Sequence, residues 1–240
     1  MELHEVSGRT RRQGNRPVCP HNQTRRARSP ARDRARTRKD TMKRMIVLTV
    51  VGLFVVLIGA WIAIGYASTR GIEEPAFTIV KTLPSYEIRE YGPQIRAEVT
   101  IPGEYRETLY AGFRQIADYI FGNNTARKEV AMTAPVLQER STRENAYTVA
   151  FIMPREYSLE SLPRPNNPAV TLRETPPMRY AVLRFSGYAT EKRAQAKTAA
   201  LLGALERDGI HPVSDPVVAQ YNPPWTPPFM RRNEIQVAIP

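Results

Sequence analysis

Residues 45–67 constrain this chain more than any other segment, because these 23 residues contain no charged side chain. An α-helix of about 20 apolar residues is long enough to cross the hydrocarbon core of a bilayer. We therefore predict a transmembrane helix over 45–67 that stays attached as a signal anchor. A cleaved signal peptide is the alternative, since Gly65 and Ala67 form a small-x-small pair before Ser68, although the apolar core of such peptides is usually about 7–15 residues long.

The flanking charge predicts the orientation of this helix. Residues 1–44 contain 14 Lys and Arg against four acidic residues, and basic flanks stay on the cytoplasmic side. We expect a single-pass membrane protein with a cytoplasmic N-terminus. The C-terminal part then lies in a periplasm or another extracytoplasmic space.

Most of the net charge of +12 lies in this N-terminal arm. Residues 1–44 are rich in Arg and have no aromatic residue, so we predict a disordered arm that serves as a topology signal rather than a specific nucleic-acid binder. Contact with anionic lipid headgroups or loose phosphate binding is the alternative. Translation that starts at Met42 would remove the arm and leave Lys43 and Arg44 as a short basic n-region.

The chain has one cysteine, Cys19, and it lies in the arm. The exported part therefore has no thiol for a disulfide, a thiolate metal site or a CxxCH haem attachment. Its stability must come from a packed core.

After a linker over 68–76, residues 77–240 have the length of one domain. Alternating apolar residues and turn formers predict strands at 77–82, 86–91, 94–101, 130–139, 146–153, 169–174, 178–186, 217–221 and 234–239. Helical spacing predicts helices at 104–121 and, after the cap Thr190, up to Arg207, with Gly122 and Gly209 as stops.

The order strand, strand, helix, strand, strand occurs twice. This internal repeat predicts an α+β fold, with a pseudo-twofold distorted antiparallel β-barrel or sheet flanked by two helices. The transmembrane helix precedes this domain.

Six motifs carry a resemblance to a known family: YEIR (86–89), GNN (122–124), MTAPV (132–136), FSG (185–187), YNPP (221–224) and RRNE (231–234). In this order and spacing the chain resembles the SOUL family of haem-binding proteins from about residue 77 to 239. The resemblance implies a distorted β-barrel with two helices and non-covalent binding of haem or other tetrapyrroles. It also implies kinship in fold with effector-binding domains of bacterial drug-responsive regulators.

The motifs themselves have structural interpretations. Arg231 and Arg232 with Glu234 are expected to pin the C-terminal strand, the alternative being contacts with ligand propionates. Arg89 should point away from the face that Tyr86 shares with Ile88, because side chains alternate along a strand.

An axial ligand for haem iron is difficult to find in this sequence. The domain has one histidine, His211, which we expect in a surface loop after the second helix. Some members of the family carry a histidine directly after the YEIR-like segment, where this chain has Glu90. We therefore expect haem binding without a strong axial ligand and without a metal site made by the protein.

The resemblance places the pocket beside the first helix of the domain, where Tyr110, Phe113 and Ala117 form an apolar stripe with Arg106 and Arg114 alongside. Solvated arginines around a core Phe113 are the alternative interpretation. Met132 and Trp225 are expected to form the opposite wall, since both side chains adapt to a flat ring. The predicted cofactor-binding residues are Arg106, Tyr110, Phe113, Arg114, Ala117, Met132 and Trp225.

No sequence motif for catalysis is present: HExxH, GxSxG, a phosphate-binding glycine loop and a CxxC pair are all missing. We therefore predict a membrane-anchored tetrapyrrole binder that acts as a carrier, buffer or scavenger, and not an enzyme. A receptor for small apolar ligands, or an envelope protein adaptor with the same fold and no haem, is the alternative. A small-molecule hydrolase is a third hypothesis, because related folds include some hydrolases.

Overall fold

The computed structural model describes residues 30–141 and 145–240, with the side chains of all but 30–37 and 40 among them. The apolar segment forms α1 (Pro30–Ala67). Within α1, the part Thr41–Ala67 is long and apolar enough to cross a membrane, and none of its most apolar window is buried. The predicted span is therefore helical throughout.

This helix begins at Pro30 and not at residue 45, so the prediction of disorder is wrong for residues 30–44. Arg, Ala and Lys are good helix formers, and a helix that already exists grows without a new nucleation step. Proline suits the first helical position because its missing N–H would have no partner there. The rest of the predicted arm, residues 1–29 with Cys19, lies outside the described residues.

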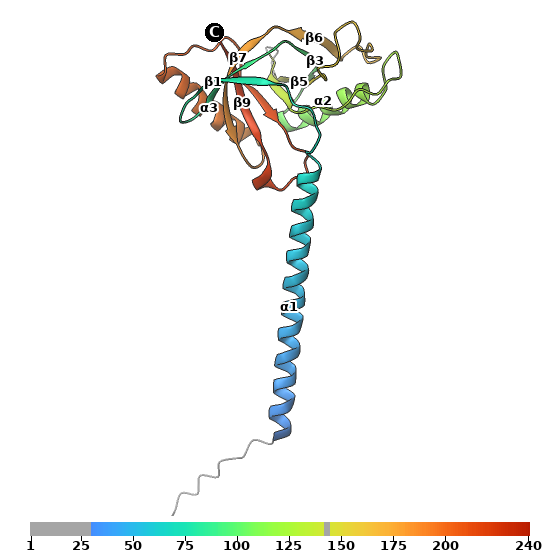
Figure 1. Cartoon of the computed structure of the whole chain (residues 1–240), viewed down its shortest axis with the longest axis vertical. Helices are drawn as coiled ribbons and strands as arrows, with labels where there is room; N and C mark the ends of the chain where they lie inside the picture. Colours follow the sequence, from blue (N-terminus) through green and yellow to red (C-terminus); the bar gives the residue numbers. More distant parts are fainter. Residues whose placement is uncertain (1–29, 142–144) are drawn as a thin grey trace, which may run out of the picture. The chain divides into compact units, whose positions relative to one another are not determined.

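The described residues after α1 form a sheet of nine strands that curls into an open half-barrel (Figure 1). Its order is β1-β2-β7-β9-β8-β4-β5-β3-β6, and every neighbouring pair is antiparallel. The strands are β1 (Phe77–Thr82), β2 (Glu87–Tyr91), β3 (Gln94–Pro102), β4 (Val136–Arg140), β5 (Ala146–Ile152), β6 (Thr171–Thr175), β7 (Met178–Phe185), β8 (Val217–Gln220) and β9 (Asn233–Ile239).

Two helices complete the domain, α2 (Tyr105–Ile120) and α3 (Glu191–Arg207), together with the short 3₁₀ helix η1 (Pro228–Met230). The orders β3-α2-β4-β5 and β7-α3-β8-β9 repeat one another, and the two halves join at the β4–β8 pair. The predicted pseudo-twofold α+β architecture is thus confirmed. Thr190 caps α3, since its hydroxyl accepts a hydrogen bond from the Arg193 amide.

The strand predicted over 130–139 begins only at Val136. The residue before it, Pro135, has no amide hydrogen for a ladder, and the Ala134–Pro135 peptide is cis. Before the proline, Thr133 pairs with Glu73 in an isolated parallel bridge and not with a neighbouring strand.

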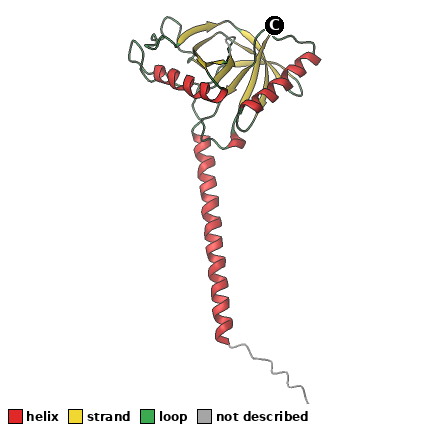
Figure 2. Ribbon diagram, turned by 180° about the vertical axis from the view of Figure 1, so that it is seen from behind, coloured by secondary structure: helices red, strands yellow, loops and turns green. Residues whose placement is uncertain are grey.

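The helices α2 and α3 cover the same face of the sheet (Figure 2). This face carries a row of direct cross-strand partners from β9, β8, β4 and β5, namely Ile235, Val218, Gln138 and Val149. The opposite face carries the adjacent row Glu234, Ala219, Leu137 and Ala150. The helix face is thus mainly apolar, whereas the opposite face contains a buried charge.

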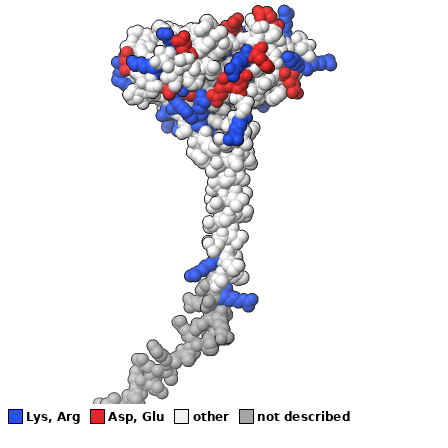
Figure 3. Space-filling model, in the orientation of Figure 1, with Lys and Arg blue, Asp and Glu red and all other residues white. Residues whose placement is uncertain are grey.

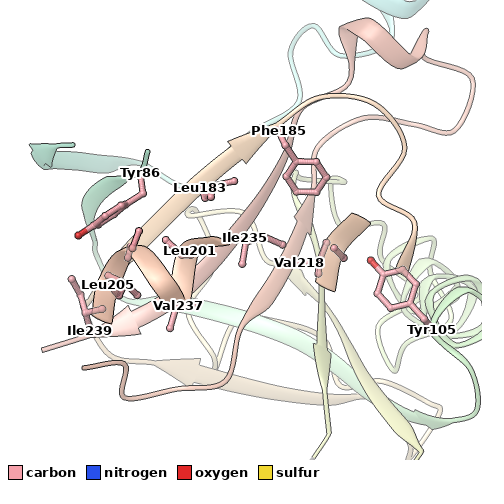
Figure 4. Close-up of a cluster of buried hydrophobic side chains, with 13 residues drawn as sticks. Tyr86, Tyr105, Leu183, Phe185, Leu201, Leu205, Val218, Ile235, Val237 and Ile239 are labelled. Atoms are coloured by element: carbon pink, nitrogen blue, oxygen red, sulfur yellow. The ribbon is translucent and has the colours of Figure 1, made fainter. Parts of the chain in front are cut away.

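Each helix covers its own part of the core. Leu201 and Leu205 of α3 pack with Ile235 and Val237 of β9 (Figure 4). Under α2, the cluster includes Ile116, Tyr119, Ile120, Val149 and Phe151. The two helices therefore have one buried face each, and their outer faces are available for binding.

Candidate functional site

The outer face of α2 carries an exposed aromatic ring between two guanidinium groups. The Tyr110 side chain is 48% exposed, and Arg106 and Arg114 lie one turn before and after it and are exposed as well. The Arg106 Cζ atom lies 5.8 Å from the centre of the Tyr110 ring. Three of the predicted binding residues therefore line one accessible strip.

Three other predicted residues lie in the core beneath this strip. Phe113 is half-buried with its ring 5.3 Å from that of Phe151, Ala117 is buried, and Met132 packs against the same cluster. Successive helical residues turn by about 100°, so the step of three from Tyr110 turns Phe113 away from the exposed strip. Phe113, Ala117 and Met132 thus position α2 from below.

A further exposed aromatic residue was missed by the sequence prediction. Phe121 follows α2 directly, and its side chain is 62% exposed. It lies eleven residues after Tyr110, which is close to three helical turns and therefore on the same face. This spacing is visible in the sequence. Because Phe121 is the last residue of the predicted helix, however, the sequence prediction did not place it on either face of that helix. The strip formed by Arg106, Tyr110, Arg114 and Phe121 is called the α2 strip below.

Trp225 lies elsewhere, in the loop before η1. Its side chain is 57% exposed, and its carbonyl oxygen accepts a 2.8 Å hydrogen bond from the Trp61 indole of α1. Among the described residues, no hydrogen bond or ring contact joins Trp225 to α2. The structure does not bring Trp225 together with the α2 strip.

A separate cleft of about 560 Å³ opens beside the start of β3 and the end of β5. Ile95, Ile152, Met153 and Leu159 are among its apolar lining residues. A cleft of this volume is within the range of small-molecule pockets.

The YEIR and RRNE motifs meet in a buried ion network. Glu234, which is fully buried, accepts hydrogen bonds of 3.1 Å from both Arg89 and Arg232. Tyr221 and Gln236 donate to its second oxygen at 2.8 and 3.0 Å. These groups are internal partners of Glu234, which agrees with the structural interpretation of both motifs.

This network sets the ionisation of Glu234. Burial raises the pKa of the Glu234 carboxyl, but the nearby Arg232 and Arg89 and the hydrogen bonds from Gln236 and Tyr221 lower it further than burial raises it. The net effect is a pKa below the usual value of a glutamate. Glu234 is therefore ionised at neutral pH despite its burial.

Arg96 is a buried cation without a carboxylate within ion-pair distance in the described part of the chain. It is 9% exposed, its Nη2 reaches Tyr180 and Gln94 only at 3.4 and 3.5 Å, and its Nε has no partner. A cavity of about 10 Å³ beside it has room for one water molecule. Side chains alternate along a strand, so Arg96 points to the face opposite that of Ala97 and Val99. In the sequence, the burial of this arginine is indicated only by its place between two apolar residues of the strand.

His211 is exposed in the loop after α3, as expected. Within residues 30–141 and 145–240, no three His, Cys, Asp or Glu side chains come together closely enough to hold a metal ion. The candidate site is therefore described by its aromatic and cationic side chains.

Comparison with known proteins agrees with the motifs. The family model described as SOUL heme-binding protein matches residues 72–238. Human heme-binding protein 2 is 29% identical over 131 residues, which are 52% of this chain and 63% of that protein. The mouse heme-binding protein 2 is 26% identical over the same length. The match thus spans less than two thirds of the length of these curated relatives.

Among solved structures, the EcmrR C-terminal domain is similar with a TM-score of 0.52. The similarity covers 66% of this chain and 99% of that domain, at 10% sequence identity. At this identity the likeness supports the fold alone.

Proposed function

Because the chain belongs to the SOUL heme-binding protein family, we propose that it binds haem or a related tetrapyrrole without a covalent bond. In this proposal α1 anchors the protein in a membrane, the domain lies on the extracytoplasmic side, and it acts as a carrier, buffer or scavenger and not as an enzyme. The observation that carries the proposal is the family match, which covers residues 72–238.

The α2 strip fits a porphyrin in chemistry. The exposed Tyr110 ring offers a flat apolar contact, and Phe121 extends this contact along the helix. The guanidinium groups of Arg106 and Arg114 can each form charge-assisted hydrogen bonds with a propionate. Phe113, Ala117 and Met132 hold α2 on the sheet and so keep these groups in place.

Bound haem would supply a redox-active iron, while the residues of this chain would hold the ring and its carboxylates. Tyr110 is the one residue of the α2 strip whose side chain has an oxygen atom, so iron coordination is tested at this position. Tyr110→Phe keeps the aromatic contact and removes the oxygen. Binding without a phenolate ligand therefore predicts an unchanged haem absorption spectrum.

A titration of the full-length chain in detergent with haemin and with iron-free protoporphyrin tests the proposal. We expect saturable one-to-one binding of both, followed by the Soret band or porphyrin absorbance and by tryptophan quenching. The double variant Arg106→Ala with Arg114→Ala should bind about tenfold or more weakly, since about 1.4 kcal/mol corresponds to a factor of ten. Lys192→Ala, which removes an exposed cation from α3, should bind as the wild type does.

Two outcomes contradict these proposals at different levels. If the wild-type chain binds neither ligand, tetrapyrrole binding is wrong. If it binds haemin and the arginine double variant keeps the full affinity, the α2 strip is not the site.

A receptor for a small apolar ligand is the second candidate function, and the cleft of about 560 Å³ favours it. Leu159→Trp narrows this cleft from its exposed rim. The variant should leave haemin affinity unchanged if haem lies on the α2 strip. A loss of haemin affinity would move the ligand to the cleft.

A further inference from the structure

The segment between α1 and the sheet is short and is tied into the domain. Ile72 packs against the buried cluster that contains Leu137 and Ile152. The Glu73 carbonyl accepts a 2.9 Å hydrogen bond from the Ala134 amide, and Glu74 forms a 2.8 Å ion pair with Arg232. Only residues 68–71 lie between the end of α1 and these contacts, and four residues span at most about 14 Å.

A loop of the domain also touches the last turns of α1. The Trp61 indole donates to the Trp225 carbonyl at 2.8 Å. Four residues later on the same helix face, a Cβ atom placed at Gly65 would lie 2.6 Å from the Cδ atom of Pro227. The loop 223–229 therefore packs against a helix position that only glycine leaves open.

The position of this contact along the helix corresponds to the edge of a bilayer. Arg44 is the last charged residue before the apolar run. With Arg44 outside the hydrocarbon core, about 20 residues rising 1.5 Å each fill the core of about 30 Å and end near Ile64. Trp61 and Gly65 then lie at the outer boundary, and so does the loop that contacts them.

The side chains around this contact are those that favour a membrane interface. Aromatic residues gather at the headgroup level, where one end is apolar and the other is wet, and arginines there attract anionic lipids. Figure 3 shows basic side chains on the side of the domain where the apolar helix ends. Four aromatic residues, Tyr66, Tyr188, Trp225 and Phe229, are exposed, as is Arg70, while Arg231 is half-buried. These six residues are called the membrane footprint.

Two pairs in the footprint each combine a tyrosine ring with an arginine cation. The Arg70 and Arg231 Cζ atoms each lie 4.3 Å from a ring centre, of Tyr66 and Tyr188 respectively. Arg231 also donates to the carbonyls of Pro224 and Thr226, so it fixes the loop. Phe229, in η1 at the end of this segment, is 66% exposed.

We propose that the loop 223–229 enters the membrane interface beside α1, with Trp225 and Phe229 at the level of the headgroups and the first acyl carbons. Arg70 and Arg231 contact lipid phosphates. The partner of the footprint is thus the bilayer surface, and the domain rests on it in one orientation. This inference depends on the membrane anchoring proposed above.

The two tryptophans of the chain allow a test with the full-length protein in vesicles of phosphatidylcholine and phosphatidylglycerol. Some of the lipids carry bromine at shallow or at deep acyl carbons, because bromine quenches nearby indole fluorescence. Trp61→Phe leaves Trp225 as the only tryptophan. We expect at least twofold stronger quenching by shallow bromine than by deep bromine, and an unquenched Trp225 would overturn the proposal.

The matched variant Trp225→Phe reports on α1 alone. If Trp61 is quenched and Trp225 is not, the anchor holds and the footprint is wrong; if neither is quenched, the anchoring itself has failed. Because Trp61→Phe also removes the indole donor to the loop, Phe229→Trp in a chain without Trp61 and Trp225 provides a second reporter. Shallow quenching at this position supports the proposal, whereas its absence contradicts it.

Discussion

At the scale of single residues, burial decides what an Arg–Glu pair contributes. Arg89 and Glu90 are neighbours on β2 and point to opposite faces of the sheet. Arg89 forms an ion pair with the fully buried Glu234. Glu90 forms a 3.1 Å ion pair with Arg179, and both of these side chains are about half exposed. Breaking a buried pair by removing one partner leaves a buried charge without compensation, but an exposed pair is screened by water.

We therefore predict that Glu234→Gln destabilises the domain by about 3 kcal/mol or more at neutral pH. The matched variant Glu90→Gln should cost less than about 1 kcal/mol. Urea unfolding followed by circular dichroism measures both. Equal losses for the two variants would show that the Glu234 network contributes no more than a surface pair.

The depressed pKa of Glu234 also predicts a pH dependence. A carboxyl whose pKa is lower in the folded than in the unfolded state contributes stability above its unfolded pKa, here about 4.5. This stability is lost as the pH falls through the folded value. The wild-type free energy of unfolding should thus fall more steeply below pH 4.5 than that of Glu234→Gln. Parallel curves for the two proteins over pH 3–6 would contradict the assignment.

At the scale of elements, the contact between α2 and the sheet depends on a missing side chain. A Cβ atom at Gly112 would lie 2.6 Å from Val149 Cβ on β5. In α3, the nearest atom to a Cβ at Gly203 is Arg207 Nη1 at 3.7 Å, at the end of a flexible side chain. The same residue type is therefore required for packing in one helix and merely tolerated in the other.

Gly112→Ala should destabilise the domain by about 1–3 kcal/mol, because overpacking outweighs the better helix propensity of alanine. Gly203→Ala should stabilise it by up to about 1 kcal/mol, since nothing opposes the gain in propensity. Thermal unfolding of both variants tests whether the two substitutions change the stability in opposite directions. A stabilised Gly112→Ala variant would mean that α2 can move away from β5 at no cost.

At the scale of the whole molecule, the proposed topology places the domain and the N-terminal segment on opposite sides of a membrane. The single Cys19 provides a natural reporter of that segment. In sealed right-side-out vesicles, a membrane-impermeant maleimide should label Cys19 only after permeabilisation. In a Cys19→Ser background, Ser158→Cys at the exposed rim of the cleft should be labelled at once.

The reverse labelling pattern would invert the topology. Mass spectrometry of the natively expressed protein addresses the two remaining alternatives of the sequence prediction. A mature protein that starts at Ser68 would reveal a cleaved signal peptide, and a start at Met42 would remove Cys19. A peptide from before Met42 would exclude the later start, and a peptide that joins Ala67 to Ser68 would exclude cleavage at that bond.

The sequence alone determined the elements, their order and the family. Apolar periods of 3.6 and 2 residues are local properties, so they revealed α2, α3 and nearly all strands, and the repeated order revealed the two halves of the sheet. Only the tertiary structure decided how distant residues meet. Arg89 and Glu234 are 145 positions apart, and Trp61 and Trp225 are 164 apart. Such contacts depend on strand register and on the rotation of each helix about its axis, and these set whether Phe113 enters the core and whether Phe121 stays outside it.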